Sequence, residues 1–188
     1  MLCTNCDSTK PNPPHKKYRD SILVFLIILL SGCSHAPQRV GENPAAATQL
    51  GSGQGEFTEA RNSLKNGHRQ EALALFSALT KSHPEMAEPF VNLGLLQLEA
   101  GNLDAAQAAF LQASQLKPEL AASYNGLGIV YRQMGRFQEA ESAYLKALQY
   151  SPDYGNAHLN LGILYDLYMD KPEDALGHYE RYKVLRGE

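Results

Sequence analysis

The 188-residue chain contains no tryptophan and only three cysteines, which are too few for the disulfide framework of a small secreted scaffold. It also lacks a surplus of basic residues, with 17 Lys and Arg against 20 Asp and Glu, which argues against a general nucleic-acid-binding protein. No apolar run reaches the roughly 20 residues that a membrane-spanning helix needs. Hydrophobic residues nevertheless make up 44% of the chain, so a packed core is expected and wholesale disorder is excluded.

Known catalytic sequence patterns are absent as well. The chain has no His-Glu-x-x-His, no Gly-x-Ser-x-Gly and no phosphate-binding P-loop. The histidines after residue 53 include no pair at the i, i+4 spacing that suits a metal ion on one helix. Cys3 and Cys6 form a single Cys-x-x-Cys pair, and no second pair follows it. We therefore expect no enzymatic activity, no bound metal ion and no cofactor.

One short apolar segment near the N-terminus predicts export. Residues 22–30 are all apolar, follow a segment with more basic than acidic side chains, and are too few to span a bilayer. This arrangement is typical of a secretory signal peptide. The segment ends in Leu30, Ser31, Gly32 and Cys33.

These four residues resemble the lipobox of bacterial lipoproteins. The resemblance implies cleavage between Gly32 and Cys33 and attachment of diacylglycerol to the Cys33 thiol, so that residues 1–32 are a removable leader. Ser34 follows the cysteine, and in that family a serine here favours sorting to the outer membrane. We expect a lipid-anchored protein on the periplasmic face of the outer membrane, because several buried acyl chains hold a protein firmly on a bilayer.

The segment after the cysteine is expected to be a tether. Residues 33–55 are rich in Ala, Gly, Pro, Gln and Ser and contain little apolar bulk. Such a composition does not offset the entropy cost of folding, so we interpret it as a flexible linker.

The remainder of the chain has a period of 34 residues. Gly67, Gly101 and Gly135 are 34 apart. Several other residues keep the same interval, and the apolar spacing within each period is helical. A period of this length indicates stacked supersecondary units. The other periodic sets are Gly94, Gly128 and Gly162; Ala72, Ala106 and Ala140, followed by Ala175; and Pro84, Pro118 and Pro152.

Each period resembles a tetratricopeptide repeat (TPR), with units at residues 53–86, 87–120, 121–154 and 155–188. The resemblance implies an all-α, right-handed TPR superhelix of about four helix-turn-helix repeats and about eight helices. The glycine at the eighth position would let two helices approach closely, and the alanine at the twentieth would face that contact. The glycines at 67, 101 and 135 suit left-handed helix ends, and each proline would end a second helix. The fourth unit carries one extra residue in its turn, and Asp170 is expected to cap its second helix.

In TPR proteins the first helices of the repeats line a concave groove. Here those helices carry apolar residues on this face as well as on the core face, which suggests a groove for an apolar strand or helix of a partner protein. Asn92 and Asn160 occupy the sixth position, where TPR families use an amide to hold a peptide backbone. The cations of a carboxylate clamp are missing from the second and sixth positions. The expected groove residues are Phe57, Arg61, Val91, Asn92, Leu95, Leu98, Asn125, Ile129, Arg132, Leu159, Asn160 and Ile163.

The last repeat is rich in tyrosine, with Tyr165, Tyr168, Tyr179 and Tyr182. A solenoid normally needs a polar terminal surface. The tyrosines predict either an exposed end that pairs with a second copy or a partner, or residues that seal the core. The sequence leaves both interpretations open.

TPR lipoproteins of this size resemble the pilotin and assembly factors of type IV and Tad-type pili, which help secretins assemble. This resemblance makes a non-enzymatic scaffold for an envelope complex the leading hypothesis. Adaptors of peptidoglycan hydrolases or periplasmic proteases, and accessories of TonB-like systems, are the alternatives.

Overall fold

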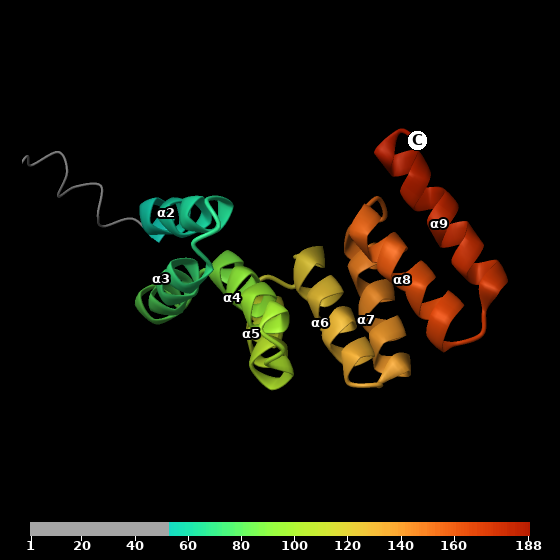
Figure 1. Cartoon of the computed structure of the whole chain (residues 1–188), viewed down its shortest axis with the longest axis horizontal. Coiled ribbons are helices and arrows are strands. Elements are labelled where there is room, and N and C mark those ends of the chain that lie inside the picture. Colours follow the sequence, from blue (N-terminus) through green and yellow to red (C-terminus); the bar gives the residue numbers. More distant parts are fainter. Residues whose placement is uncertain (1–52) are drawn as a thin grey trace, which may run out of the picture. The chain divides into compact units, whose positions relative to one another are not determined.

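The computed structural model describes residues 53–188, and within them every regular element is an α-helix. The predicted leader, Cys33 with its lipid, and the linker up to residue 52 lie outside the described residues. The all-α prediction with eight helices is confirmed (Figure 1). The helices are α2 (Gly53–Lys65), α3 (Arg69–Ser82), α4 (Ala87–Glu99), α5 (Leu103–Leu116), α6 (Ala121–Gln133), α7 (Phe137–Tyr150), α8 (Gly155–Tyr168) and α9 (Pro172–Arg186).

Consecutive helices pack against each other along the chain, as Figure 1 shows. The largest contacts join the two helices of one repeat, such as α6 with α7, and smaller ones join neighbouring repeats, such as α5 with α6. The first helices of adjacent repeats also touch, since α4 contacts α6 and α6 contacts α8. The four first helices begin at Gly53, Ala87, Ala121 and Gly155, the first residues of the four predicted units. None of these helices is long and apolar enough to cross a membrane.

The turns inside the repeats depend on left-handed backbone conformations. Gly67, Gly101 and Gly135 follow first helices and have φ of 82°, 78° and 75°. The fourth repeat carries one more residue, and Asp170 takes the equivalent place with a φ of 52°. Aspartate is among the few non-glycine residues that tolerate this region.

Small and large side chains alternate in the core. Ala72, Ala106 and Ala140 are fully buried, and the second helices also bury one aromatic ring each in the first three repeats. Phe110 lies against Gly94 so closely that a Cβ on this glycine would come within 2.8 Å of the ring. The aromatic side chain therefore fills the space that the missing side chain leaves open.

Helix α2 begins earlier than the linker composition suggests. The sequence places residues 53–55 both in the tether and in the first repeat, and the structure places them in the first turn of α2. Gly53 is buried there, and a Cβ would lie 2.7 Å from Met86 and 2.8 Å from the His83 ring. Tertiary packing thus extends the helix into a segment whose composition alone favours a linker.

The last helix, α9, has only one fully buried residue, Ala175. Leu176 and Val184 on α9 are 57% and 64% exposed. Lys183 stands at the position that Leu148 holds one repeat earlier, so the surface of α9 is mainly polar. Of the four tyrosines, Tyr165 is buried, Tyr168 is exposed, and the two on α9 are half-buried. These placements divide the tyrosines between core and surface, and pairing of two copies at this end stays a prediction.

Candidate functional site

The predicted groove residues occupy α2, α4, α6 and α8, and we call their outward surface the first-helix face. The structure buries three of them, Phe57, Val91 and Asn125, which pack in the core. The others remain wholly or partly accessible to a partner. Arg61 and Leu95 are exposed, and the half-buried members are Asn92, Leu98, Ile129, Arg132, Leu159, Asn160 and Ile163.

The amides on this face are held in place by hydrogen bonds. Asn160 Nδ2 on α8 donates to Asn125 Oδ1 on α6 over 2.9 Å, which links two neighbouring repeats. Asn92 Nδ2 donates to the Glu88 carbonyl over 2.9 Å within α4. The half-buried amides of Asn92 and Asn160 keep further hydrogen-bonding capacity, because an asparagine side chain has two donors and an acceptor. A peptide backbone could use that capacity.

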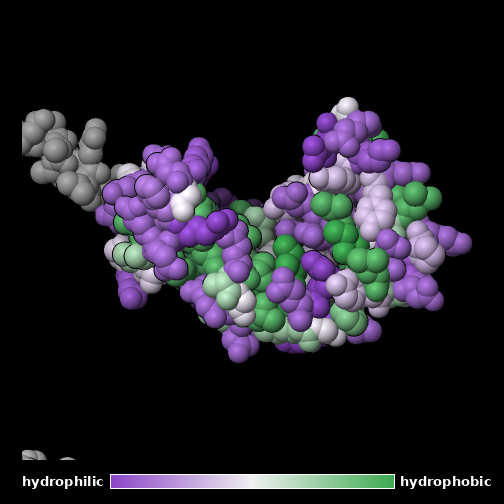
Figure 2. All heavy atoms as spheres, in the orientation of Figure 1, coloured by the Kyte–Doolittle hydropathy of each residue, from purple (hydrophilic) through white to green (hydrophobic). Residues whose placement is uncertain are grey.

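Apolar side chains lie among these amides. Leu95 is 40% exposed and Leu167, near the end of α8, is 67% exposed. Figure 2 shows hydrophobic residues gathered among hydrophilic ones over the middle and C-terminal helices, whereas the surface over α2 and α3 is mainly hydrophilic. Exposed leucines are ordinary one by one, but several beside ordered amides are typical of an interaction surface.

The acidic groups on this face already have partners. Lys117 Nζ donates to Glu88 Oε1 over 3.0 Å, and this hydrogen bond lowers the pKa of Glu88. Arg69 Nε donates to Glu99 Oε2 over 3.0 Å, and the Tyr179 hydroxyl donates to Asp166 over 3.3 Å. Cations therefore compensate the charges of Glu88 and Glu99, whereas Asp166 keeps its charge beside a neutral hydroxyl.

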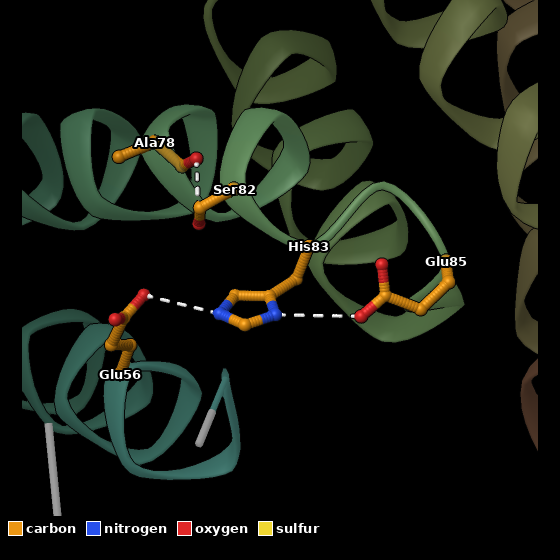
Figure 3. Close-up of polar contacts among 5 residues, drawn as sticks. All are labelled: Glu56, Ala78, Ser82, His83 and Glu85. Carbon is orange, nitrogen blue, oxygen red and sulfur yellow. Dashed lines mark hydrogen bonds and ion pairs between the residues drawn. The ribbon is translucent and has the colours of Figure 1, made fainter. Parts of the chain in front are cut away.

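His83 links the turn after α3 to α2 within the first repeat (Figure 3). Its Nε2 lies 3.9 Å from Glu56 Oε2 on α2, and its Nδ1 lies 3.4 Å from Glu85 Oε1 in the following turn. Because the two carboxylates meet opposite ring nitrogens, they do not converge on one point. The arrangement suits a structural link and not an ion site. Within residues 53–188, no three His, Cys, Asp or Glu side chains are arranged to hold a metal ion.

The fourth repeat contains a pair of histidines that helical spacing does not indicate. His158 Nδ1 on α8 lies 2.9 Å from His178 Nδ1 on α9. His158 Nε2 donates to the Pro152 carbonyl over 2.9 Å, which leaves His158 Nδ1 to accept a hydrogen bond from His178. The two residues are 20 apart in the chain, so only their places in the repeat could have indicated the contact. Two repeats earlier, the same places hold Phe90 and Ala109.

The histidine pair predicts that stability falls on acidification. Burial lowers the pKa of His178, and His158 lowers it further, while Asp174 opposes them. The unfolded chain therefore binds more protons than the folded chain as the pH falls below the usual value near 6.5. We expect the free energy of unfolding, measured in urea, to decrease from that pH downwards until His178 titrates in the folded state. His178→Gln should flatten this decrease.

The exposed His68 offers the matched control, because its side chain is 64% exposed at the start of α3. The His68→Gln variant should keep the wild-type pH dependence. A His178→Gln variant whose unfolding free energy depends on pH as the wild type does would refute the assignment.

The comparison with known protein families divides the chain near the boundary between the second and third repeats. Two family profiles, both described as tetratricopeptide repeat, match residues 57–121 and residues 119–182. Together they cover more than half of the chain. A comparison with curated proteins finds no match to the chain.

Solved structures of TPR proteins share the fold. A crystal structure of MamA superposes with a TM-score of 0.64 and 19% identity, covering 77% of this chain and 84% of that chain. A thermophilic TPR protein from Thermus thermophilus gives a TM-score of 0.64 and 22% identity, covering 71% and 74%. MamA from Desulfovibrio magneticus gives 0.61 and 19%, covering 72% and 76%. At these identities the likeness concerns the fold alone, while the repeat profiles place the chain in the tetratricopeptide repeat family.

Proposed function

We propose that the protein is a non-enzymatic scaffold on the periplasmic face of the outer membrane. It would assist assembly of an envelope complex such as a type IV or Tad-type pilus or a secretin. TPR proteins are generally protein-binding scaffolds, and the family assignment supports the binding part of this proposal. The Leu-Ser-Gly-Cys sequence that ends at Cys33 supports the location.

The observation that carries the proposal is the mixture of side chains on the first-helix face. An exposed leucine, Leu95, stands beside the half-buried amide of Asn92 on α4, and α8 carries the half-buried Asn160 and Ile163 at the equivalent positions. Apolar groups provide affinity by leaving water, and amides can bind the backbone of an extended or helical partner. The partner segment is therefore expected to be largely apolar.

The proposal predicts that Leu95→Glu removes partner binding. A carboxylate at the centre of an apolar contact must lose its hydration without a compensating charge, so we expect crosslinked partners in cells to fall at least about tenfold, which corresponds to roughly 1.4 kcal/mol. The measurement is crosslinking in cells followed by mass spectrometry. Leu145→Glu is the matched control, because Leu145 is 46% exposed but lies on α7, outside the first-helix face.

Equal partner recovery from the Leu95→Glu variant and the wild type would place binding elsewhere on the molecule.

A further variant, made in the same bacterial strain, tests the lipid anchor. Cys33→Ala should abolish incorporation of labelled palmitate and release the protein from the membrane fraction. Labelling of this variant at the wild-type level would exclude Cys33 as the lipid-bearing residue.

A further inference from the structure

Helix α9 packs against the rest of the described chain on one side only. Among residues 53–188 its extensive contacts are with α8, whereas α7 packs against both α6 and α8 (Figure 1). Helix α7 buries four residues, and α9 buries only Ala175. A helix with few buried contacts opens locally at a lower free-energy cost than helices inside the array. The contacts between α8 and α9 therefore determine how firmly α9 is held.

The histidine pair lies within this interface. The Nδ1 atoms of His158 on α8 and His178 on α9 are 2.9 Å apart, and both side chains are half-buried. The Tyr165 ring of α8 packs against His178, with ring centres 5.7 Å apart. Tyr165 is also contacted by Lys171, which pairs with Glu141 on α7. The pair is thus enclosed by side chains of α8 and α9 and is partly shielded from water.

The surrounding charges do not remove the cost of protonation. Burial lowers the pKa of His178, and His158 lowers it further, while Asp174, one turn earlier on α9, raises it. The net direction is downward, although Asp174 is the acid that acts on His178 most directly. When α9 leaves α8, His178 regains its ordinary affinity for protons, so acidification favours the separated state.

The positions of the protons explain why the contact is sensitive to acid. In the neutral pair His178 Nδ1 donates to His158 Nδ1, because His158 Nε2 already donates to the Pro152 carbonyl. A proton added at His178 Nε2 places a cation in the half-buried interface. A proton added at His158 Nδ1 removes the acceptor. When both protons are present, two cationic rings direct N–H groups at each other, and the rings must separate.

We infer that the contact between His158 and His178 is a pH-sensitive link that holds α9 on α8, and that acidification releases α9 as a unit while α4–α7 stay folded. Release moves Tyr179 away from Gly162, where an added Cβ would lie 2.7 Å from the ring, and uncovers the side of α8 that carries Tyr165. The acid sensitivity is thereby assigned to one helix and not to the whole fold. The link depends neither on the identity of a partner nor on the lipid anchor.

Hydrogen–deuterium exchange followed by mass spectrometry measures the opening of each helix separately. The full chain in detergent is compared at about pH 7.5 and about pH 5.5, on either side of the ordinary histidine pKa, after correction for the intrinsic exchange rate at each pH. We expect the protection of the α9 amides to fall at least about fivefold at the lower pH, the smallest effect expected from a buried donor left without an acceptor. The protection of α4 to α7 should stay nearly constant.

Three variants connect this change to the histidine pair. His178→Gln and His158→Gln each remove one of the two imidazoles, so in both variants the protection of α9 should no longer depend on pH. His68→Gln removes an exposed histidine at the start of α3, outside the interface, and should keep the wild-type change. Circular dichroism at about pH 7.5 verifies that each variant is folded. Two variants of the pair are used so that one remains informative if the other loses α9 contacts at both pH values.

Three results would overturn the link. The first is equal protection of α9 at the two pH values in the wild type. The second is a loss of similar size in every helix, which would mean that acid weakens the whole fold. The third is a loss in α9 that persists at the wild-type size in both His178→Gln and His158→Gln.

Discussion

Replacing Gly128 by alanine is expected to destabilise the protein by about 2–3 kcal/mol, the upper part of the range for overpacking a core. A Cβ at this position would lie 2.5 Å from Tyr144 Cδ1 and 2.7 Å from Cζ. The obstacle is a ring that is fully buried and cannot rotate into solvent. Helix α6 and helix α7 would have to separate, even though alanine is the better helix former. Urea denaturation followed by circular dichroism measures the loss.

Gly177→Ala is the matched control for this substitution. Gly177 also lies inside a helix, α9, and no heavy atom of a neighbouring side chain or helix lies within 4 Å of a Cβ added there. Here only the intrinsic preference operates, so the variant should be more stable by about 0.5–1 kcal/mol. Helix propensity alone would change the unfolding free energy in the same direction for both glycine-to-alanine substitutions. Changes of opposite sign would therefore point to the contact with Tyr144. A Gly128→Ala variant as stable as the wild type would mean that Tyr144 can move aside.

Replacing Phe110 by alanine is expected to cost about 3–5 kcal/mol, as for other fully buried aromatic residues. Phe110 is 0% exposed and lies between Gly94 on α4 and Gly126 on α6. Glycines face the ring from both sides, and they have no side chains that could relax into the cavity. The loss removes packing within the second repeat and between the second and third repeats. Leu111→Ala, at the adjacent 37% exposed position, should cost far less, about 0.5 kcal/mol.

A second substitution tests this explanation of the Phe110 effect. A Cβ at Gly126 would lie 2.5 Å from Phe110 Cζ, so Gly126→Ala should destabilise the wild type. In the Phe110→Ala background the added methyl group would enter the cavity, and the same change should be neutral or stabilising. Additive effects of the two substitutions would contradict direct contact between ring and glycine.

The repeat architecture could be predicted because its signals are local and recur. An interval of 34 residues between Gly67, Gly101 and Gly135 places left-handed turns at fixed points, and all three glycines have positive φ. The helices that flank these turns follow from apolar spacing alone. The exception at Asp170 shows the limit of such patterns: an extra residue shifts the turn, and a side chain expected to cap the last helix instead occupies the left-handed position.

The functional details were less accessible to sequence reasoning because they depend on pairs far apart in the chain. The hydrogen bond between Asn125 and Asn160 and the contact between His158 and His178 join different helices, so no short motif contains them. The sequence could not show whether Val91 is buried or exposed, because α4 is apolar on two sides. The structure buries Val91 on the core side of this helix.

Gly126 has a mechanical consequence. At this sixth position α6 has a glycine, where α4 and α8 have Asn92 and Asn160, and the Phe110 ring occupies the vacated space. The joint between the second and third repeats therefore resists compression, because an incompressible ring is wedged directly against a backbone. Bending of the array under load should concentrate at its other joints. A partner bound across both α4 and α6 would therefore contact the joint that bends least.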